Sequence, residues 1–245
     1  SKELMNNKII LIISCFIIAN CSDEDSNQAR LSAVILPEYS FFTVVADCSL
    51  AKGNSLIDLE SFLSSHAILK GNTGSSVSLL FPDNSVSVNN FLIYTKGSSE
   101  VGANNTINNI YIDGLETIST CSYEQPSKSL NLFTNPLNLS QSEDYSITEI
   151  LNCSYNDGYS YGSFVIAVDR LIQKMEMFKS KYEIDYIELS DGKSFLWVNR
   201  FNNSFYKSEL PELWLKNSEE SSEIQNEFKD NAVCNNATVY KEFSL

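Results

Sequence analysis

The sequence has little of what metal and acid–base sites usually need. It contains one histidine, His66, and no Cys-x-x-Cys pair among its six cysteines. A structural zinc site takes about four cysteine or histidine ligands at short spacing. Haem or metal chemistry would need more partners than His66 and scattered carboxylates. The sequence therefore predicts no metal and no other cofactor, and we assign no catalytic residue from it.

Positive charge is also scarce. The chain has 17 Lys and Arg residues against 31 Asp and Glu residues, which gives a formal net charge of −14. Nucleic acids carry dense negative charge, so this chain is a poor electrostatic match to them. The sequence therefore predicts no nucleic-acid partner, and the simplest effect of the charge excess is solubility.

Long hydrophobic runs are missing as well. The apolar segment at residues 9–19 follows Lys8 and is shorter than the ~20 residues of a usual membrane-spanning helix. Its length and its basic start are typical of the core of a signal peptide. We therefore expect residues 1–20 to be a signal peptide.

The residues Ile18-Ala19-Asn20-Cys21 resemble a bacterial lipoprotein processing site. In such proteins the cysteine becomes the lipidated N-terminus. We therefore expect lipidation at Cys21, a polar tether at residues 21–30, and the membrane as a partner through this lipid anchor. We expect the protein to be located in the bacterial cell envelope, facing the periplasm, or to be secreted.

One pattern that is present occurs twice. Residues 48–55 and 153–160 both read Cys-Ser-x-x-x-Gly-x-Ser, and each follows a strand-like run and opens a helix-like run. The segments Phe91–Lys96 and Phe195–Arg200 match in the same way. Repeated matches in the same order predict a tandem duplication.

Within each copy we expect the order strand, helix, strand, strand, helix, strand. Apolar residues at helical spacing predict a helix over Ser163 to Lys181, and acidic residues favour the start of another near Ser218. The corresponding second helix of copy one, around Thr106 to Ser119, is weakly indicated because it contains Gly114. Copy two carries an expected insertion near Asn202 to Leu215.

This βαββαβ order is that of the ferredoxin-like fold, which is an α+β fold. We expect a ferredoxin-like repeat at residues 31–136, a linker at 137–146 and a second repeat at 147–245. By analogy, the two sheets are expected to pair as a pseudo-dimeric α/β barrel.

Each copy contains two further cysteines. In an oxidising compartment, an even number at equivalent positions predicts disulfides, with free buried thiols as the alternative. The repeat favours the pairs Cys48–Cys121 and Cys153–Cys234 among the three possible pairings. In this prediction the first and last strands of a sheet are not neighbours, so the end of the second helix must reach over the sheet.

The most enzyme-like motif is Gly-x-Ser-x-Gly at residues 158–162, which fits a nucleophile elbow. In that class of hydrolase the histidine follows the serine, but His66 precedes Ser160. The serine recurs as Ser55 in copy one, and serine at a helix start commonly caps free N–H groups. We therefore favour a structural role for Ser160, and a surface or packing role for His66.

Aromatic residues gather in copy two without counterparts in copy one. Tyrosine and tryptophan combine apolar area with a hydrogen-bonding tip, so they serve in cores and in ligand clefts. We expect most of them to pack in the core. The candidates for a cleft are Tyr155, Tyr159, Tyr161, Trp197 and Trp214.

Residues 153–158 before a helix, Trp197 in the later strand and the run from Trp214 to Cys234 resemble one family of secreted-looking proteins of marine bacteria. The similarity is stronger in copy two, since in copy one Lys52 replaces an acidic residue of the motif. That family has no established activity. The resemblance therefore implies an envelope address and no site residues.

From these observations we expect a non-catalytic envelope lipoprotein that binds a small ligand or a protein partner. The alternative is an enzyme of the dimeric α/β-barrel type, a cofactor-free monooxygenase or isomerase with a pocket between sheet and helices. An enclosed pocket with several polar groups would favour the enzyme. A filled core with an exposed apolar patch would favour binding alone.

Overall fold

The computed structural model describes residues 39–65, 74–83, 89–135, 145–178, 182–216 and 218–245. The expected signal peptide, the tether, Cys21 and His66 lie outside the described residues, as does most of the expected linker. Below, the first half means residues 39–135 and the second half means residues 145–245.

Both halves contain the predicted succession of strands and helices. The strands are β1 (Tyr39–Leu50), β2 (Ser75–Pro82), β3 (Asn90–Gly97), β4 (Ser119–Ser122), β5 (Ser127–Thr134), β6 (Ser146–Tyr155), β7 (Tyr182–Glu188), β8 (Ser194–Phe201), β9 (Ala232–Cys234) and β10 (Thr238–Ser244). The helical segments are α3 (Leu56–Ser65), α5 (Glu100–Ile110), the π-helix η1 (Tyr111–Leu115), α6 (Glu116–Ile118), α7 (Tyr161–Phe178), α8 (Ser204–Lys216) and α9 (Ser218–Asn231).

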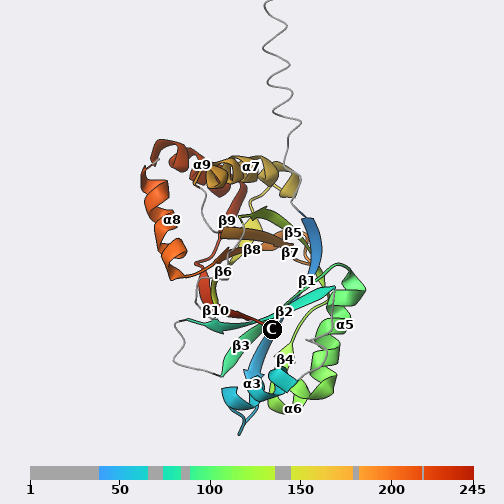
Figure 1. Ribbon diagram of the computed structural model, residues 1–245. Helices are drawn as coiled ribbons and strands as arrows, with labels where there is room; N and C mark the ends of the chain where they lie inside the picture. Colours follow the sequence, from blue (N-terminus) through green and yellow to red (C-terminus); the bar gives the residue numbers. More distant parts are fainter. Residues whose placement is uncertain (1–38, 66–73, 84–88, 136–144, 179–181, 217) are drawn as a thin grey trace, which may run out of the picture. The chain divides into compact units, whose positions relative to one another are not determined.

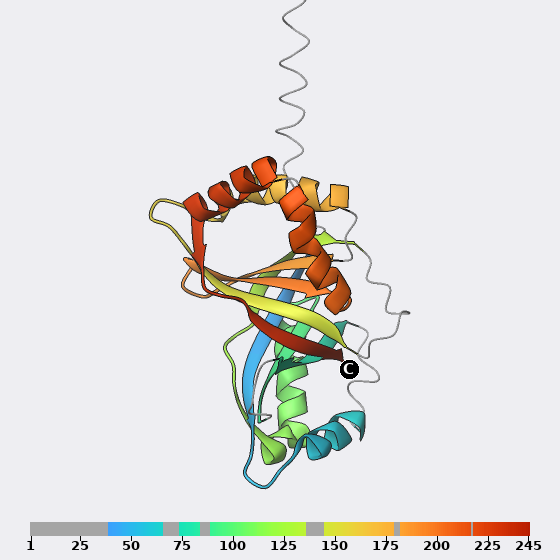
Figure 2. The same cartoon turned by 90° about the vertical axis from the view of Figure 1, so that its left-hand side faces the viewer.

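The main strands form a closed antiparallel β-barrel (Figure 1). Their order is β10-β2-β3-β1-β5-β7-β8-β6, and β10 also pairs with β6, which closes a ring of eight strands. Figure 2 shows β10 (red) running beside β6 (yellow). The short strands β4 and β9 pair with β1 and β6 respectively. A closed ring leaves no long unpaired sheet edge.

The two halves have the same strand order. In the first half it is β2-β3-β1-β5, and in the second half it is β7-β8-β6-β10. The first and last strands of each half are therefore direct neighbours, and the prediction that they lie apart is wrong. After the second helix the chain returns to the free side of the first strand, so the last strand pairs there.

Two disulfides each join the first strand of a half to a short strand that pairs with it. Cys48 on β1 lies opposite Cys121 on β4, and Cys153 on β6 lies opposite Cys234 on β9. The sulfur atoms are bonded in both pairs, with Cα–Cα distances of 4.1 and 4.0 Å. These are the predicted pairings, but the bonds form between paired strands, and no helix has to reach over the sheet.

Alternation along the strands separates two environments. On β8, Trp197 faces the helices, whereas Val198 and Arg200 lie in the barrel interior. Helices α3 and α5 cover the outside of the first half, and α7 and α9 cover the second half (Figure 1). Each large apolar side chain buried between sheet and helices contributes about 1.5–3 kcal/mol.

The helix boundaries follow local signals with one main difference. The structure starts the second helix of the first half at Glu100, earlier than predicted, because Ser99 accepts a hydrogen bond from the Gly102 N–H at 3.0 Å. Gly114 has φ +134° and interrupts this helix, as its sequence suggested. The expected insertion in the second half forms α8. Among the described residues, none of the helices combines the length and the hydrophobicity of a membrane-spanning segment.

Candidate functional site

The predicted aromatic cleft residues are mainly packed in the second half. Trp197 is 6% exposed, and its Nε1 donates to Asn199 Oδ1 at 2.7 Å. Tyr155, at the end of β6, packs against Phe195, and Tyr161 packs against Tyr186. Trp214 packs edge-on against Phe178, and Tyr159 is exposed. None of these five predicted residues lines either of the two cavities described below.

The tyrosine hydroxyls in this aromatic layer remain protonated at ordinary pH. Tyr155 and Tyr186 share a hydrogen bond of 2.8 Å between their hydroxyl oxygens. Burial raises the pKa of Tyr186 to about 12, and burial also raises the pKa of Tyr155. A neutral phenol suits a packed layer, and in this layer the tyrosines act as hydrogen-bonded core residues.

Ser160, the centre of the elbow-like motif, lies directly before α7. Its backbone N–H donates to Ser163 Oγ at 3.0 Å, and its carbonyl accepts from the N–H groups of Ser163 and Phe164. Ser55 precedes α3 in the same way, and its hydroxyl donates to Asp58 Oδ2 at 2.7 Å. Both serines therefore help to start a helix.

A first cavity lies between α3 and the outer face of the sheet; we call it the α3 cavity. Its volume is about 600 Å³. It is lined by Leu56, Leu59, Glu60, Leu63, Ser64, Leu79, Phe81, Pro82, Asn90, Lys241, Phe243, Ser244 and Leu245. Leucine and phenylalanine dominate this lining, and Glu60, Asn90 and Lys241 add polar groups. Such a lining is typical of a pocket for a small, largely apolar molecule.

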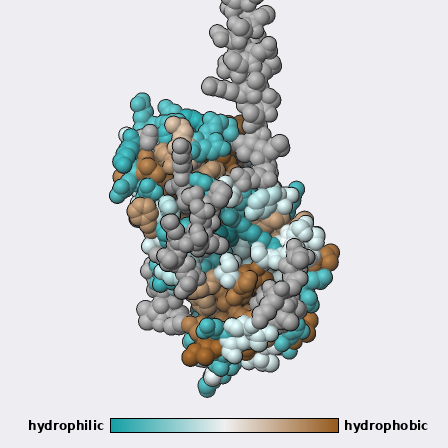
Figure 3. All heavy atoms as spheres, viewed as in Figure 1, coloured by the Kyte–Doolittle hydropathy of each residue, from teal (hydrophilic) through white to brown (hydrophobic). Residues whose placement is uncertain are grey.

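The surface around the α3 cavity agrees with its apolar lining. In Figure 3 the upper surface, over α7 to α9, is mostly hydrophilic, whereas hydrophobic residues gather lower down, in the region where Figure 1 places α3. The cation of Lys241 is held nearby, with Nζ 3.3 Å from Asp83 Oδ1 and 5.2 Å from the Tyr145 ring centroid. The cavity therefore combines an apolar wall with a placed cation.

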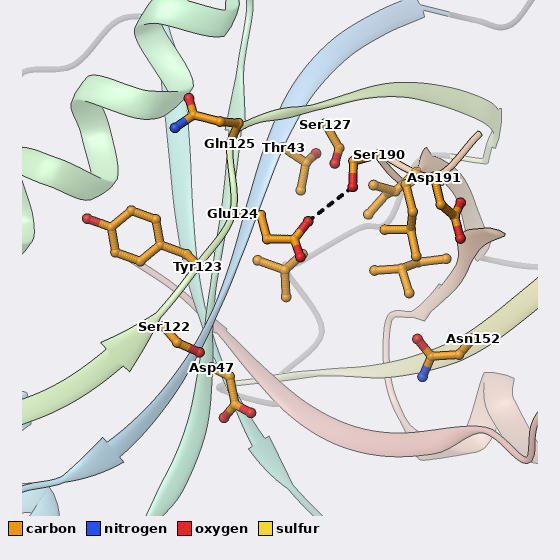
Figure 4. Close-up of a pocket in the computed structure, with 14 residues that line it drawn as sticks. Thr43, Asp47, Ser122, Tyr123, Glu124, Gln125, Ser127, Asn152, Ser190 and Asp191 are labelled. Atoms are coloured by element: carbon orange, nitrogen blue, oxygen red, sulfur yellow. Dashed lines mark hydrogen bonds between the residues drawn. The ribbon is translucent and has the colours of Figure 1, made fainter. Parts of the chain in front are cut away.

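A second cavity, of about 790 Å³, opens at one end of the barrel; we call it the barrel-mouth cavity (Figure 4). It is lined by Thr43, Val45, Asp47, Ser122, Tyr123, Glu124, Gln125, Ser127, Asn152, Ile187, Leu189, Ser190, Asp191 and Leu196. Strands β1, β6, β7 and β8 supply six of these residues, β4 and β5 supply Ser122 and Ser127, and the loops β4–β5 and β7–β8 supply the rest. The lining contains three carboxylates and no Lys, Arg or His.

Two of these carboxylates are fixed by local hydrogen bonds. Asp191 Oδ1 accepts hydrogen bonds from the backbone N–H groups of Lys193 and Ser194 at 2.9 and 2.7 Å. These bonds lower the pKa of Asp191, and the bond from Lys193 has the largest effect. Glu124 Oε2 accepts a long hydrogen bond of 3.5 Å from Ser190 Oγ, which links the two loops (Figure 4). Asp191 is therefore held as a negatively charged group at the cavity.

The barrel interior contains an ion network of Lys96, Glu183, Asp185, Arg200 and Glu242. Lys96 Nζ lies 2.8 Å from Asp185 Oδ2, and Arg200 Nε lies 2.9 Å from Glu242 Oε2. Arg200 also pairs with Glu183 at 2.9 Å and with Asp185. Its guanidinium lies 4.5 Å from the ring centroid of Tyr94. This network joins the first half to the second across the interior.

The pKa values of the network carboxylates are shifted by their surroundings. Burial raises the pKa of Asp185, but Arg200 and Lys96 together lower this pKa by more than burial raises it, so the net shift is downward. Burial likewise raises the pKa of Glu242, and Arg200 with Thr148 more than offsets this. Both groups are therefore ionised at neutral pH and serve as counter-ions inside the barrel.

Sequence reasoning did not single out this network. The sequence contains one sign of the two cations of this network. Lys96 and Arg200 are the last residues of the matching segments Phe91–Lys96 and Phe195–Arg200. Their acidic partners come from distant strands and had no such pattern.

In the described part of the chain, no group of three or more His, Cys, Asp or Glu residues is arranged to hold a metal ion.

Comparison with known proteins places the fold in a class. No protein-family model and no curated protein matches the sequence. A candidate monooxygenase from Lactobacillus acidophilus is 9% identical, with 84% of this chain and 94% of that chain covered and a TM-score of 0.56. A candidate monooxygenase from Fusobacterium nucleatum is also 9% identical, with 85% and 94% covered and a TM-score of 0.54.

A third solved structure, a candidate chlorite dismutase, is 11% identical, with 83% of this chain and 94% of that chain covered and a TM-score of 0.51. Together these neighbours define the class as the dimeric α+β barrel. At such low identity the likeness shows the fold.

The comparison corrects one expectation from the sequence. The prediction of a non-catalytic binding module is wrong, because the neighbours with this fold are described as monooxygenases and a chlorite dismutase, which are enzymes. The sequence showed no sign of this, because its most enzyme-like motif, around Ser160, forms the start of a helix.

Proposed function

We propose that the chain is an enzyme of the dimeric α+β-barrel type, a cofactor-free monooxygenase or isomerase that binds a small apolar substrate in the α3 cavity. The observation that carries this proposal is an apolar cavity of about 600 Å³ between sheet and helix, in a fold shared with candidate monooxygenases. A cavity of this size suits a molecule of two or three fused rings.

The chemistry that fits is oxidation of a substrate that supplies its own electrons. An activated aromatic CH₂ group loses a proton, reacts with O₂ and becomes a carbonyl, with the second oxygen atom leaving as water. In this proposal Glu60 accepts the proton. Lys241 and Asn90, which also line the cavity, stabilise the resulting anion.

The test uses purified protein with no added cofactor and a panel of tricyclic aromatic ketones that carry a CH₂ group between the rings. We expect O₂ consumption and carbonyl formation in equal amounts, or substrate isomerisation without O₂ uptake. Glu60→Gln should lower kcat by about 10²-fold or more if Glu60 is the base. No turnover by the wild-type protein across the panel would count against an enzyme acting at this cavity.

A matched pair of variants on α3 separates cavity blocking from general damage. Leu56 lines the cavity, whereas the next residue, Ile57, is 75% exposed and does not. Leu56→Trp should raise KM by filling the cavity, and Ile57→Trp should leave KM and kcat unchanged. Equal effects of the two changes would contradict the assignment of the α3 cavity.

We propose that the two halves arose by duplication of a ferredoxin-like unit. The proposal is supported by the shared strand order, the equivalent disulfides and the matched positions of Lys96 and Arg200. Superposing the two halves should bring Cys48 onto Cys153 and Phe91 onto Phe195. A superposition that aligns the sheets but offsets these pairs would argue against duplication.

We also propose export to the bacterial envelope with lipidation at Cys21. The support is the processing-site motif together with two disulfides, which form and persist in oxidising compartments. A single acyl chain anchors only marginally, so several chains on Cys21 are expected. Mass spectrometry of the mature N-terminus should find acylated Cys21, and an unmodified N-terminus elsewhere would rule this out.

A further inference from the structure

We propose that the barrel-mouth cavity is a second ligand site, which binds a linear polyamine or a similar organic polycation. The site shares no lining residue with the α3 cavity. It therefore goes beyond the proposed enzymatic function and stands independently of it.

The charge of the lining selects a cation. Asp47 comes from β1, Glu124 from the segment between β4 and β5, and Asp191 from the segment between β7 and β8. Figure 4 shows these three carboxylates at separate positions around the cavity. The lining contains no basic side chain, and Lys193 lies outside it while its charge contributes to lowering the pKa of Asp191. A cationic ligand would add positive charge inside the cavity itself.

The separate positions of the carboxylates in Figure 4 favour an extended organic cation over a metal ion. A metal ion needs its carboxylate ligands within about 2–2.6 Å of one centre. No group of three or more His, Cys, Asp or Glu residues in the described segments has such an arrangement. A chain with ammonium groups several bonds apart can instead place one charge near each carboxylate.

A buried hydroxyl supplies a second, independent indication of a ligand. Thr43 is 1% exposed and lines the cavity, and Figure 4 shows it among the lining side chains. It lies near the Tyr94 phenol, but its Oγ1 has no hydrogen bond of acceptable geometry within the described residues. A buried hydroxyl without a partner is costly, and an N–H group of a bound amine would satisfy it.

The remaining wall suits the hydrocarbon part of such a ligand. Val45, Ile187 and Leu196 face the cavity between the polar groups, and Ile187 is buried. Methylene segments between the ammonium groups can pack on these side chains. The volume of about 790 Å³ holds a ligand of this length.

The experiment is a calorimetric titration of the full chain with spermidine at low ionic strength. We expect saturable binding with one site per chain. Asp47→Asn and Glu124→Gln should each raise the Kd about two- to fivefold, as expected for exposed charge pairs, and together about four- to twenty-fivefold. Thr43→Val should raise the Kd further without changing the net charge.

The matched control is Glu116→Gln, which removes one negative charge from an exposed residue of α6 outside the cavity. It should leave the Kd of spermidine unchanged. A Kd that rises equally in Glu116→Gln and Asp47→Asn would overturn the proposal, because it would indicate a diffuse counter-ion effect. Absence of saturable binding, or displacement of spermidine by Mg²⁺ at equal charge concentration, would overturn it too.

Discussion

At the scale of single residues, Asp185 holds a central place in the barrel interior. It is fully buried, and it pairs with Lys96 and Arg200 while Asn131 donates to it at 3.0 Å. A buried charge is costly unless it is paired and hydrogen-bonded, so each member of the network depends on the others. Removing one partner leaves uncompensated charge inside the barrel.

We therefore predict that Asp185→Ala lowers the free energy of unfolding by about 3–5 kcal/mol, because it removes the more deeply buried of the two carboxylates that Lys96 and Arg200 share. Urea denaturation at neutral pH measures this. Glu188 lies on the same strand but is exposed, so Glu188→Ala should change the stability by less than about 0.5 kcal/mol. Equal losses in the two variants would show that the buried ion network contributes no more to the free energy of unfolding than an exposed carboxylate does.

The same carboxylates predict how stability depends on pH. The pKa values of Asp185 and Glu242 are lower in the folded protein than their ordinary values of 3.8 and 4.5. Their stabilising effect is therefore complete above those ordinary values and is lost as the pH falls through the lowered folded values. We expect the urea concentration at the unfolding midpoint to decrease when the pH is lowered below about 4. In Asp185→Asn this decrease should be less steep.

At the scale of elements, each disulfide ties a short outer strand to the first strand of its half. Cys48–Cys121 closes a sequence separation of 73 residues, and Cys153–Cys234 closes one of 81. In the chain-entropy model, loops of this length stabilise the folded state by about 4 kcal/mol per bond. The short strands β4 and β9 have few ladder hydrogen bonds of their own, so these bonds fix their position.

We predict that the double change Cys153→Ala and Cys234→Ala, like its counterpart at Cys48 and Cys121, lowers the free energy of unfolding by up to about 4 kcal/mol. Denaturant titration measures the loss, and reduced wild-type protein should lose about the sum of the two. Peptide mapping without reductant identifies the partners. Bonds between the halves, such as Cys48 with Cys153, would contradict the structure.

At the scale of the whole molecule, the two halves share one closed sheet. Strand β10 pairs with β2 of the first half and with β6 of the second, and β5 pairs with β7. The interior ion network crosses the same boundary. Neither half can therefore complete its hydrogen-bonding without the other, even though each has its own layer of helices.

We predict that the described part of the chain unfolds in one cooperative transition. Both tryptophans, Trp197 and Trp214, lie in the second half, so their fluorescence reports on that half alone. Hydrogen exchange of the β3 amides reports on the first half. The two probes should give the same denaturant midpoint. Separate midpoints would mean that the halves unfold as independent domains.

The sequence by itself determined the local structure and the covalent links. Apolar spacing placed α7 and the strands, an acidic start marked α9, and the repeated pattern paired Cys48 with Cys121 and Cys153 with Cys234. These features depend on neighbouring residues or on a repeat that can be read along the chain. The barrel itself followed by analogy from the same order of elements.

Only the tertiary structure decided how the sheet closes and where the cavities lie. Asp185, Arg200 and Glu242 come from three strands, and nothing in their own surroundings in the sequence marks them as partners. The predicted cleft aromatics fill a packed layer, whereas the cavities lie elsewhere, because packing depends on how side chains from distant segments fit together. A cavity is space left by many such fits, and no single segment encodes it.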